Sequence, residues 1–230
     1  MSWIKDFIYL FFPRTCCVCG TPLVDSEHEI CVKCLMNLPE AKGAVGDANF
    51  VEKRLMGRIP LTAATALLIF KKQNATQRIL HQIKYRGNEK LAITMGRQLG
   101  LLLANDQRFS DVDLLVPIPL HKRKERRRGD NQSLLLCKGI AQTFPRPIVS
   151  DNLIRLRHTP SQTNKNRQQR LENMKGVFSV IDTRQFEGKH MLLIDDVLTT
   201  GATTESCCLA LTSISDIRIS VAVLAVTGDN

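Results

Sequence analysis

Residues 190–203 combine the residue types that bind a sugar phosphate. An apolar run ends at two adjacent acids, Asp195 and Asp196, and is followed by the turn Thr-Thr-Gly-Ala-Thr at 199–203. The run predicts a strand buried on both faces, and open α/β sheets bind ligands at the carboxyl ends of such strands. A helix is predicted after the turn, and its first N–H groups favour a phosphate monoester. The residues expected to hold this phosphate are Thr199, Thr200, Gly201, Ala202 and Thr203.

The two acids need a different partner from the phosphate, because carboxylates repel it. We expect them to face ribose hydroxyls or a hydrated Mg²⁺. The alternatives are that the acids only cap a helix, or that they hold the metal of an ATPase. An ATPase needs G-x-x-x-x-G-K-[ST] and a dinucleotide-binding protein needs G-x-G-x-x-G, and neither pattern occurs in the chain.

A strongly basic run, Lys-Arg-Lys-Glu-Arg-Arg-Arg, occupies residues 122–128, shortly after a predicted strand at 112–116. Its positive charge suits a diphosphate. The same run is also typical of a solvated face or a nucleic-acid patch, although it has no interleaved aromatic residue on which a base could stack. The net charge of +10 favours polyanionic ligands in general.

The chain contains 8 cysteines, and four of them form two C-x-x-C pairs near the N-terminus. This spacing predicts a closed tetrahedral site with a structural role, in which Zn²⁺ is the favoured metal and iron the alternative. Cys17 and His28 are possible substitutes for one ligand, and four free cysteines in a small core are the remaining interpretation. The predicted metal ligands are Cys16, Cys19, Cys31 and Cys34.

The composition, 43% hydrophobic and 23% charged, is that of a globular protein. No apolar run reaches the roughly 18 residues that span a bilayer, which predicts no transmembrane segment. Residues 4–12 are too short and too charged for a good secretory signal, so we expect a cytoplasmic protein. A helix at the N-terminus is expected to pack on the chain or a partner, or to lie on a membrane surface.

Strands and helices alternate from residue 61 onward. This alternation predicts an α/β fold with a mainly parallel sheet flanked by helices. We expect an N-terminal helix and cysteine module over 1–40, a linker over 41–60 and one α/β domain over 61–230. The strands are expected at 62–70, 112–116, 191–194 and 217–226, and the helices at 76–84, 91–103, 131–143 and 202–213.

Together these motifs resemble the ComF family, which are bacterial competence-associated proteins with a type I phosphoribosyltransferase domain. The acids and the threonine turn are similar to the motif that binds phosphoribosyl diphosphate (PRPP). The cysteine pairs match as well, and the resemblance extends over nearly the whole chain. Further matches are Lys84-Tyr85-x-Gly87, Pro117-Ile118-Pro119-Leu120-His121, Arg128-Gly129-x-Asn131-Gln132, and the set Arg155, Arg157, Thr159, Gln162, Arg170, Asn173 and Phe178.

The resemblance implies roles for individual residues. The candidate catalytic residues Asp195 and Asp196 would face the ribose of Mg-PRPP, and the turn after 112–116 would contact its pyrophosphate. The residues implied at that turn are Pro117, Arg123 and Arg128, and those implied in a flexible loop over the reacting centre are Arg157, Gln162 and Arg170.

Two functions follow from the resemblance. The first is a phosphoribosyltransferase that moves the phosphoribosyl group from Mg-PRPP to an unidentified acceptor and releases pyrophosphate. The alternative is a non-catalytic PRPP-binding protein in DNA uptake, competence or DNA processing, with single-stranded DNA or DNA-uptake proteins as partners. A nucleic-acid binder that depends only on zinc would leave the motif at 195–203 unexplained.

Overall fold

The computed structural model describes residues 13–46, 49–120, 131–156 and 176–228. Its helices are α2 (Val32–Met36), α3 (Phe50–Leu55), α4 (Ala75–Tyr85), α5 (Glu89–Ala104), α7 (Gln132–Ile140) and α9 (Ala202–Leu211), with short 3-10 turns at Lys42–Ala44, Gln107–Phe109 and Thr183–Gln185. Its strands are β1 (Ala63–Phe70), β2 (Leu114–Pro117), β3 (Leu153–Arg155), β4 (Phe178–Val180), β5 (His190–Leu198) and β6 (Arg218–Thr227).

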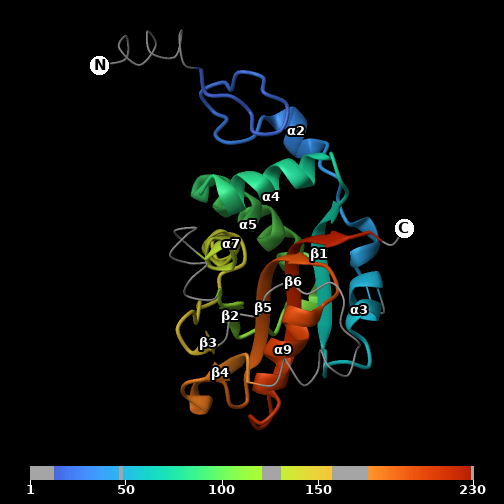
Figure 1. Ribbon diagram of the computed structural model, residues 1–230, viewed down its shortest axis with the longest axis vertical. Coiled ribbons are helices and arrows are strands. Elements are labelled where there is room, and N and C mark those ends of the chain that lie inside the picture. The colour runs from blue at the N-terminus through green and yellow to red at the C-terminus, as the bar shows by residue number, and fades with distance from the viewer. Residues whose placement is uncertain (1–12, 47–48, 121–130, 157–175, 229–230) are drawn as a thin grey trace.

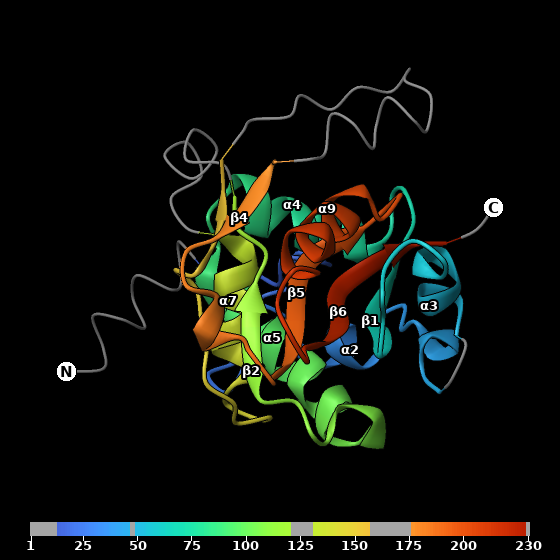
Figure 2. The same cartoon turned by 90° about the horizontal axis from the view of Figure 1, so that it is seen from below.

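The centre of the molecule is a four-stranded sheet in the order β1-β6-β5-β2. All of its pairings are parallel, and β3 and β4 form a separate antiparallel pair. One apolar cluster packs α4, α5 and α7 on one face of the sheet, and a second packs α3, α9 and the β3–β4 pair on the other (Figures 1 and 2). The predicted fold, a mainly parallel sheet flanked by helices, is confirmed.

The expected strands and helices from 62 onward are confirmed, with ends that differ by a few residues. The largest difference is in β5, which continues to Leu198 instead of ending at Ile194. It continues because its backbone stays paired with β6, where Val197 is opposite Ala225. The two acids therefore lie within a strand and not in a loop.

The segment expected to be a linker, 41–60, contains helix α3. Val51 and Leu55 of this helix are fully buried against the sheet, and Asn49 caps its first turn. Residues 50–55 of the expected linker are therefore helical. The boundaries of the domains stay a prediction.

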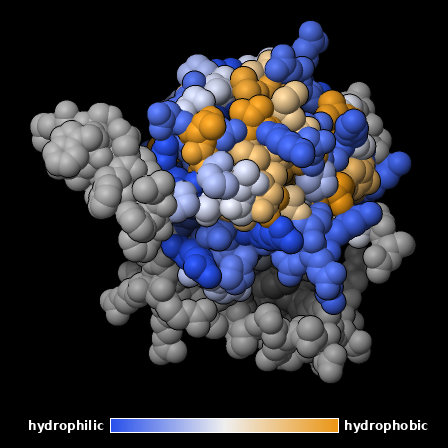
Figure 3. Space-filling model, turned by 90° about the horizontal axis from the view of Figure 1, so that it is seen from above, coloured by the Kyte–Doolittle hydropathy of each residue, from blue (hydrophilic) through white to orange (hydrophobic). Residues whose placement is uncertain are grey.

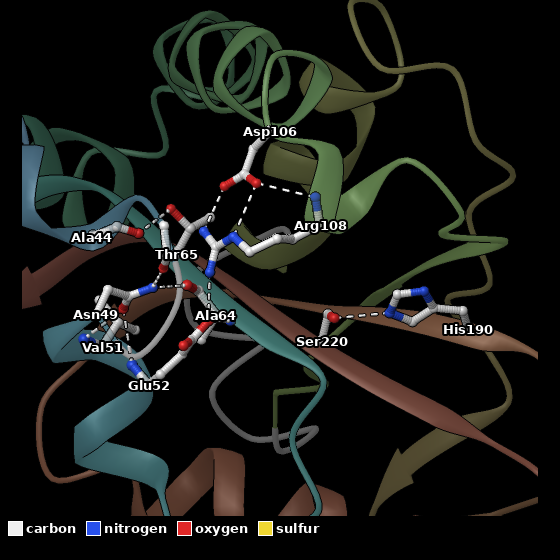
Figure 4. A network of polar contacts seen from close by, with 11 residues as sticks. Ala44, Asn49, Val51, Glu52, Ala64, Thr65, Asp106, Arg108, His190 and Ser220 are labelled. Carbon is white, nitrogen blue, oxygen red and sulfur yellow. Dashed lines mark hydrogen bonds and ion pairs between the residues drawn. The ribbon is translucent and has the colours of Figure 1, made fainter.

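The same segment covers the outer edge of β1. Ala41 donates its N–H to the carbonyl of Leu67 at 2.8 Å. Further along the edge, the side chain of Glu52 accepts the N–H of Ala64 at 3.0 Å, and Asn49 donates to the carbonyl of Ala64 at 2.9 Å (Figure 4). An ion pair of 2.6 Å between Glu52 and Arg108 holds the glutamate in this position. The side chains of Asn49, which caps α3, and of Glu52 within α3 thus complete hydrogen bonds that the sheet leaves open.

The cysteine-containing segment, residues 13–38, packs on helix α4. Cys16 and Cys31 belong to the same apolar cluster as Ile79 of this helix. Arg78 donates to the carbonyl of Val18. The outer surface of the segment is partly apolar, as the view from above shows (Figure 3), and its exposed side chains include Val24, Val32 and Met36.

Within the described ranges, no helix has the length and apolar character needed to cross a membrane.

Helices α5 and α7 touch through their backbones. A Cβ atom built on Gly96 would lie 2.4 Å from the carbonyl oxygen of Leu136, and one on Gly139 would lie 2.2 Å from that of Ile93. Such distances are far below van der Waals contact, so any side chain at these positions would push the helices apart. This contact sets the position of α7, whose first turn reaches the acids of β5.

We expect Gly96→Ala to destabilise the protein by about 1–3 kcal/mol, because the overpacking outweighs the gain in helix propensity. Denaturant unfolding measures the change. Lys90→Ala, at an exposed position of the same helix, is the control and should leave the free energy of unfolding nearly unchanged. Equal stability of Gly96→Ala and the wild type would contradict the close packing.

Candidate functional site

The two acids lie where the sheet becomes narrower. Strand β2 ends at Pro117, which is opposite Ile194 of β5, whereas β5 continues beside β6 with Asp195 opposite Val223. Past Ile194, β5 thus has a paired neighbour on one side only. The acids are partly accessible, at the carboxyl ends of the parallel strands where the sequence analysis placed them.

The two carboxylates have different partners, which come from two different helices. Oδ1 of Asp195 accepts hydrogen bonds from Ser133 Oγ at 3.2 Å and from the N–H of Asp196 at 2.9 Å. Oδ2 of Asp196 lies 2.9 Å from Lys84 Nζ. In the described ranges of the chain, Oδ2 of Asp195 and Oδ1 of Asp196 receive no hydrogen bond. With respect to the described residues, each acid therefore keeps one oxygen that can accept a hydrogen bond from a ligand.

The surrounding protein changes the acidity of Asp195. Burial raises its pKa to about 7, and the charge of Asp196 adds to this rise, while the hydrogen bonds and Lys84 oppose it. Arg155 on β3 is near enough for its charge to interact with Asp195, and burial lowers the pKa of its guanidinium. This guanidinium lies over the ring of Phe178, 5.2 Å from the centroid. A proton can therefore be held or released at Asp195 near neutral pH.

The threonine turn begins helix α9 in the predicted manner. Gly201, at the N-terminal boundary of the helix, has a φ of 78°, which glycine adopts without strain. Gly201 has no side chain with which to cap this helix, whereas Asn74, Asn88 and Asn131 cap α4, α5 and α7. The N–H of Ala202 donates only a long hydrogen bond, of 3.4 Å, to Thr200 Oγ1. Thr199, Thr200 and Thr203 are exposed, Ala202 is partly exposed, and only Gly201 is buried. The first N–H groups of α9 thus lie at an accessible terminus, where an anion is stabilised.

The turn is supported by α3, which the sequence analysis did not connect with the site. Arg54 and Arg58 donate hydrogen bonds to the carbonyl oxygens of Thr199 and Thr200. A sequence signal for this helix exists: Asn49 followed by Glu52 is a capping pattern, and Val51 and Leu55 have helical spacing. Lys84 and Ser133 were also missed as partners of the acids, although the sequence analysis included Lys84 among the matching motifs.

Pro117, expected in the turn after the strand, is instead the buried last residue of β2. Its contact with PRPP stays a prediction. The other predicted contacts, which are Arg123, Arg128, Arg157, Gln162 and Arg170, lie outside the described residues.

The four predicted metal ligands are brought together. The sulfur atoms of Cys16, Cys19, Cys31 and Cys34 all lie within 4.8 Å of one another. The distance between Cys19 Sγ and Cys31 Sγ is 3.8 Å. A tetrahedron with metal–sulfur bonds of about 2.3 Å has edges of about 3.8 Å, so the cluster fits a metal such as zinc. Backbone N–H groups also point at the sulfurs, since Val18 and Cys31 both donate to Cys16 Sγ at 3.4 Å.

A second polar network lies at the opposite ends of the strands. His190 contacts Asp111 through Nδ1 at 2.8 Å. Its Nε2 lies 2.8 Å from Ser220 Oγ (Figure 4). The three residue types are those of a hydrolase triad. However, His190 and Ser220 are completely buried, so a substrate cannot reach the serine. We interpret this network as structural: it joins β5 and β6 to the residues before β2.

A cavity of about 510 Å³ lies between residues 40–45 and α5, and Leu67, Leu101 and Asn105 are part of its lining. None of the predicted site residues lines it. The candidate site is therefore defined by the strand ends and the start of α9.

Curated proteins with similar sequences carry names from DNA uptake and use. No family model matches the chain. The chain is 29% identical over 191 residues to the DNA utilization protein YhgH of Escherichia coli, an alignment that covers 82% of this chain and 73% of that protein. It is 28% identical over 129 residues to competence protein F of Haemophilus influenzae, covering 54% and 56% of the two chains. Competence protein ComFC of Bacillus subtilis is 27% identical over 209 residues, covering 88% and 80%. These similarities confirm the resemblance to the ComF family.

Solved structures with a detectable likeness include phosphoribosyltransferases. An adenine phosphoribosyltransferase from Leishmania donovani has 16% identity and a TM-score of 0.36, with 81% of this chain and 87% of that chain covered. A hypoxanthine phosphoribosyltransferase from Staphylococcus aureus has 16% identity and a TM-score of 0.34, covering 60% and 62%. A glutamine PRPP amidotransferase from Bacillus subtilis has 17% identity and a TM-score of 0.38, but the match is only 26% of that chain.

The raised pKa of Asp195 makes stability depend on pH. Between the unfolded value, near 4, and about 7, the folded protein retains a proton that the unfolded chain has lost. The free energy of unfolding should therefore decrease as pH rises through this window and level off above it. Asp195→Asn removes this contribution, so its stability relative to the wild type should increase from pH 4 to pH 7.

Denaturant unfolding at several pH values tests this expectation. Asp216→Asn is the matched control, since Asp216 is exposed at the other end of the sheet and asparagine tolerates its φ of 54°. A stability difference between Asp195→Asn and the wild type that stays constant from pH 4 to pH 7 would contradict the raised pKa.

Proposed function

We propose that this protein binds Mg-PRPP and transfers its phosphoribosyl group to an acceptor with release of pyrophosphate. One observation carries the proposal: two acids lie at the carboxyl end of β5, each with an oxygen atom that receives no hydrogen bond from the described residues, and an accessible helix terminus with glycine at its N-cap position follows them in the chain. A ligand with vicinal hydroxyls and a phosphate monoester has groups for both features, and ribose 5-phosphate compounds combine them.

In this proposal each residue type has one task. The N–H groups at the start of α9 donate to the 5′-phosphate, assisted by the hydroxyl groups of Thr199, Thr200 and Thr203. Asp195 Oδ2 and Asp196 Oδ1 accept hydrogen bonds from the ribose hydroxyls, which fixes the sugar ring. As the bond from C1 to pyrophosphate breaks, the carboxylates stabilise the positive charge that develops on the ribose. A nucleophilic atom of the acceptor then forms the new bond to C1 and loses its proton.

Carboxylate oxygens such as those of Asp195 and Asp196 are ligands that Mg²⁺ prefers, which fits a magnesium complex of the ligand. When bound, Mg²⁺ would stabilise the negative charge of the leaving pyrophosphate. Lys84 binds Asp196 Oδ2 and Ser133 binds Asp195 Oδ1, so the orientation of each carboxylate is fixed and its second oxygen is available to the ligand.

Residues outside the described ranges retain their proposed roles from the family resemblance. Arg123 and Arg128 belong to the basic run after β2, which we propose contacts the pyrophosphate. Arg157, Gln162 and Arg170 belong to the segment between β3 and β4 that we propose closes over the reacting centre. A cytoplasmic location is proposed with them, as the compartment of a PRPP-dependent reaction.

A second candidate function is a PRPP-binding protein that acts in DNA uptake or processing without catalysis. The names of the curated relatives favour it, since they refer to DNA utilization and competence. The net charge of +10 also favours an encounter with a polyanion such as single-stranded DNA. Both candidates use the same ligand site and differ only in whether pyrophosphate is released.

The cysteine cluster is proposed to hold a structural Zn²⁺. Four thiolate ligands leave no open position for a substrate, so the metal would stabilise the segment 13–38 and take no part in the transfer. Since this segment packs on α4, which carries Lys84, the metal would support the candidate site indirectly.

The ligand site is tested with Asp195→Asn combined with Asp196→Asn. We expect this variant to lose at least about tenfold in affinity for Mg-PRPP, because both hydrogen-bond acceptors of the ribose are weakened, while the fold is retained. Calorimetry measures the affinity, and Asp216→Asn serves as control. Unchanged affinity would reject the assignment of the acids.

An assay of pyrophosphate release with the wild type, the double variant and the control distinguishes the two candidate functions. Each is incubated with Mg-PRPP and a panel of bases, amines and oligonucleotides, and pyrophosphate release is followed. Release that depends on an acceptor and disappears in the double variant would show transfer. Tight PRPP binding without release from any acceptor would favour the binding protein.

The metal site is tested by comparing two neighbouring cysteines. We expect about one zinc ion per chain in the wild type and in Cys17→Ser, because Cys17 lies outside the cluster. Cys19→Ser should lose the metal, and since Cys19 is exposed, its substitution leaves the core intact. Metal analysis by mass spectrometry measures both, and the absence of zinc from the wild type would contradict the proposal.

A further inference from the structure

Two arginines beside the threonine turn bind its backbone, and neither belongs to a motif found in the sequence. Arg58, just after α3, donates from Nη1 to the carbonyl oxygen of Thr200 at 2.6 Å. Arg54, within α3, donates from Nη1 to the carbonyl oxygen of Thr199 at 3.2 Å and to Thr227 Oγ1 at 2.7 Å. Helix α3 is 145 residues away from the turn in sequence, so these are tertiary contacts that the fold creates.

The hydrogen bonds from the arginines to the carbonyl oxygens also orient the N–H groups of the turn. A trans peptide unit is planar, and its C=O and N–H point to opposite sides. The carbonyl of Thr199 shares a peptide unit with the N–H of Thr200, and that of Thr200 shares one with the N–H of Gly201. When the arginines hold the two carbonyls toward α3, they direct the two N–H groups away from α3, where they can donate to an anion.

The fit of α3 against the turn is tight. A Cβ atom on Gly201 would lie 2.8 Å from Leu55 Cδ2 and 3.2 Å from Arg58 Nη1. The absence of a side chain at Gly201 thus permits both its positive φ and the approach of α3. The turn cannot rotate toward α3 without a clash.

Arg58 also holds a carboxylate of the same helix terminus. Its Nε donates to Glu205 Oε2 at 3.0 Å, and Glu205 is largely buried in the first turn of α9. Without this partner the glutamate would place an unbalanced negative charge near the phosphate site. Arg58 therefore connects two parts of the terminus, the Thr200 carbonyl and the Glu205 side chain.

We propose that Arg58, supported by Arg54, is a positioning residue of the phosphate turn: by holding the Thr200 carbonyl, it orients the N–H groups that bind a 5′-phosphate. The inference rests on the proposed function and adds a residue to its site. Because both arginines lie on the carbonyl side of the turn, they act through its backbone and do not contact the phosphate.

Calorimetry with two Mg²⁺-containing ligands tests the role. Arg58→Gln should raise the Kd of ribose 5-phosphate about tenfold, as expected for the loss of a charge-assisted hydrogen bond, and should raise the Kd of PRPP in the same proportion. The Kd of magnesium pyrophosphate, which has no 5′-phosphate, should change less than about twofold, since that part of the ligand binds elsewhere. Retained pyrophosphate binding also shows that the variant is folded.

Two further variants exclude a merely structural effect. In Arg58→Gln combined with Glu205→Gln no unbalanced carboxylate remains, so a persistent loss of ribose 5-phosphate affinity supports the carbonyl contact. Recovery of the affinity would overturn it. Arg54→Gln keeps Arg58 in place. It should lose less affinity for ribose 5-phosphate than Arg58→Gln and keep its affinity for magnesium pyrophosphate. This variant tests the proposal if Arg58→Gln does not fold. Arg184→Gln is the control, because Arg184 is an exposed arginine that pairs with Asp182.

The outcomes distinguish the inference from the proposed function. If the wild type binds ribose 5-phosphate and all arginine variants bind it equally well, the positioning role is wrong and the proposed function stands. If the losses are equal for ribose 5-phosphate and pyrophosphate, the effect is not specific to the turn and the inference is overturned. If the wild type binds none of the three ligands, the proposed function fails and the inference fails with it.

Discussion

Two carboxylates on adjacent residues can lie together at the end of β5 because each has its own partner. Lys84 lies 2.9 Å from Asp196 and balances its charge, while Ser133 and a backbone N–H bind Asp195. Without Lys84, two negative charges in a partly buried position would repel each other, and the strand end would be unfavourable. Burial, and after it the charge of Asp196, still raises the pKa of Asp195, so a cation or a hydroxyl donor bound beside this carboxyl group would favour its ionised form.

The helices that supply these partners are fixed by other parts of the chain. Helix α4 carries Lys84 and is also the helix on which the cysteine segment packs. Helix α7 carries Ser133 in its first turn, and its position follows from the backbone contact between Gly96 and Gly139. The acids themselves come from the sheet. The candidate site thus depends on three separate packing contacts, and only the sheet contact involves residues of the motif at 195–203.

Much of the fold and part of the site could be predicted from the sequence. The alternation of apolar strands with segments of helical spacing predicted the parallel sheet. The cysteine spacing predicted the four metal ligands that the structure brings together. The acids were found because an apolar strand, paired acids and a threonine turn occur in a continuous segment. Arg54 of α3 and Arg58 just after it were not found, because their partners are 145 and 142 residues away and no local pattern encodes those contacts. The length of β5 was underestimated for a similar reason: charged residues seldom continue a buried strand, and here pairing with β6 extends it.

Residues 39–52 cover the outer edge of β1 and so limit self-association through that edge. An edge strand with unpaired N–H and C=O groups can pair with a strand of another molecule, which extends the sheet and leads to aggregation. Here the backbone of Ala41 and the side chains of Asn49 and Glu52 already use groups along that edge. Addition of a strand from another copy is therefore disfavoured at the outer edge of β1.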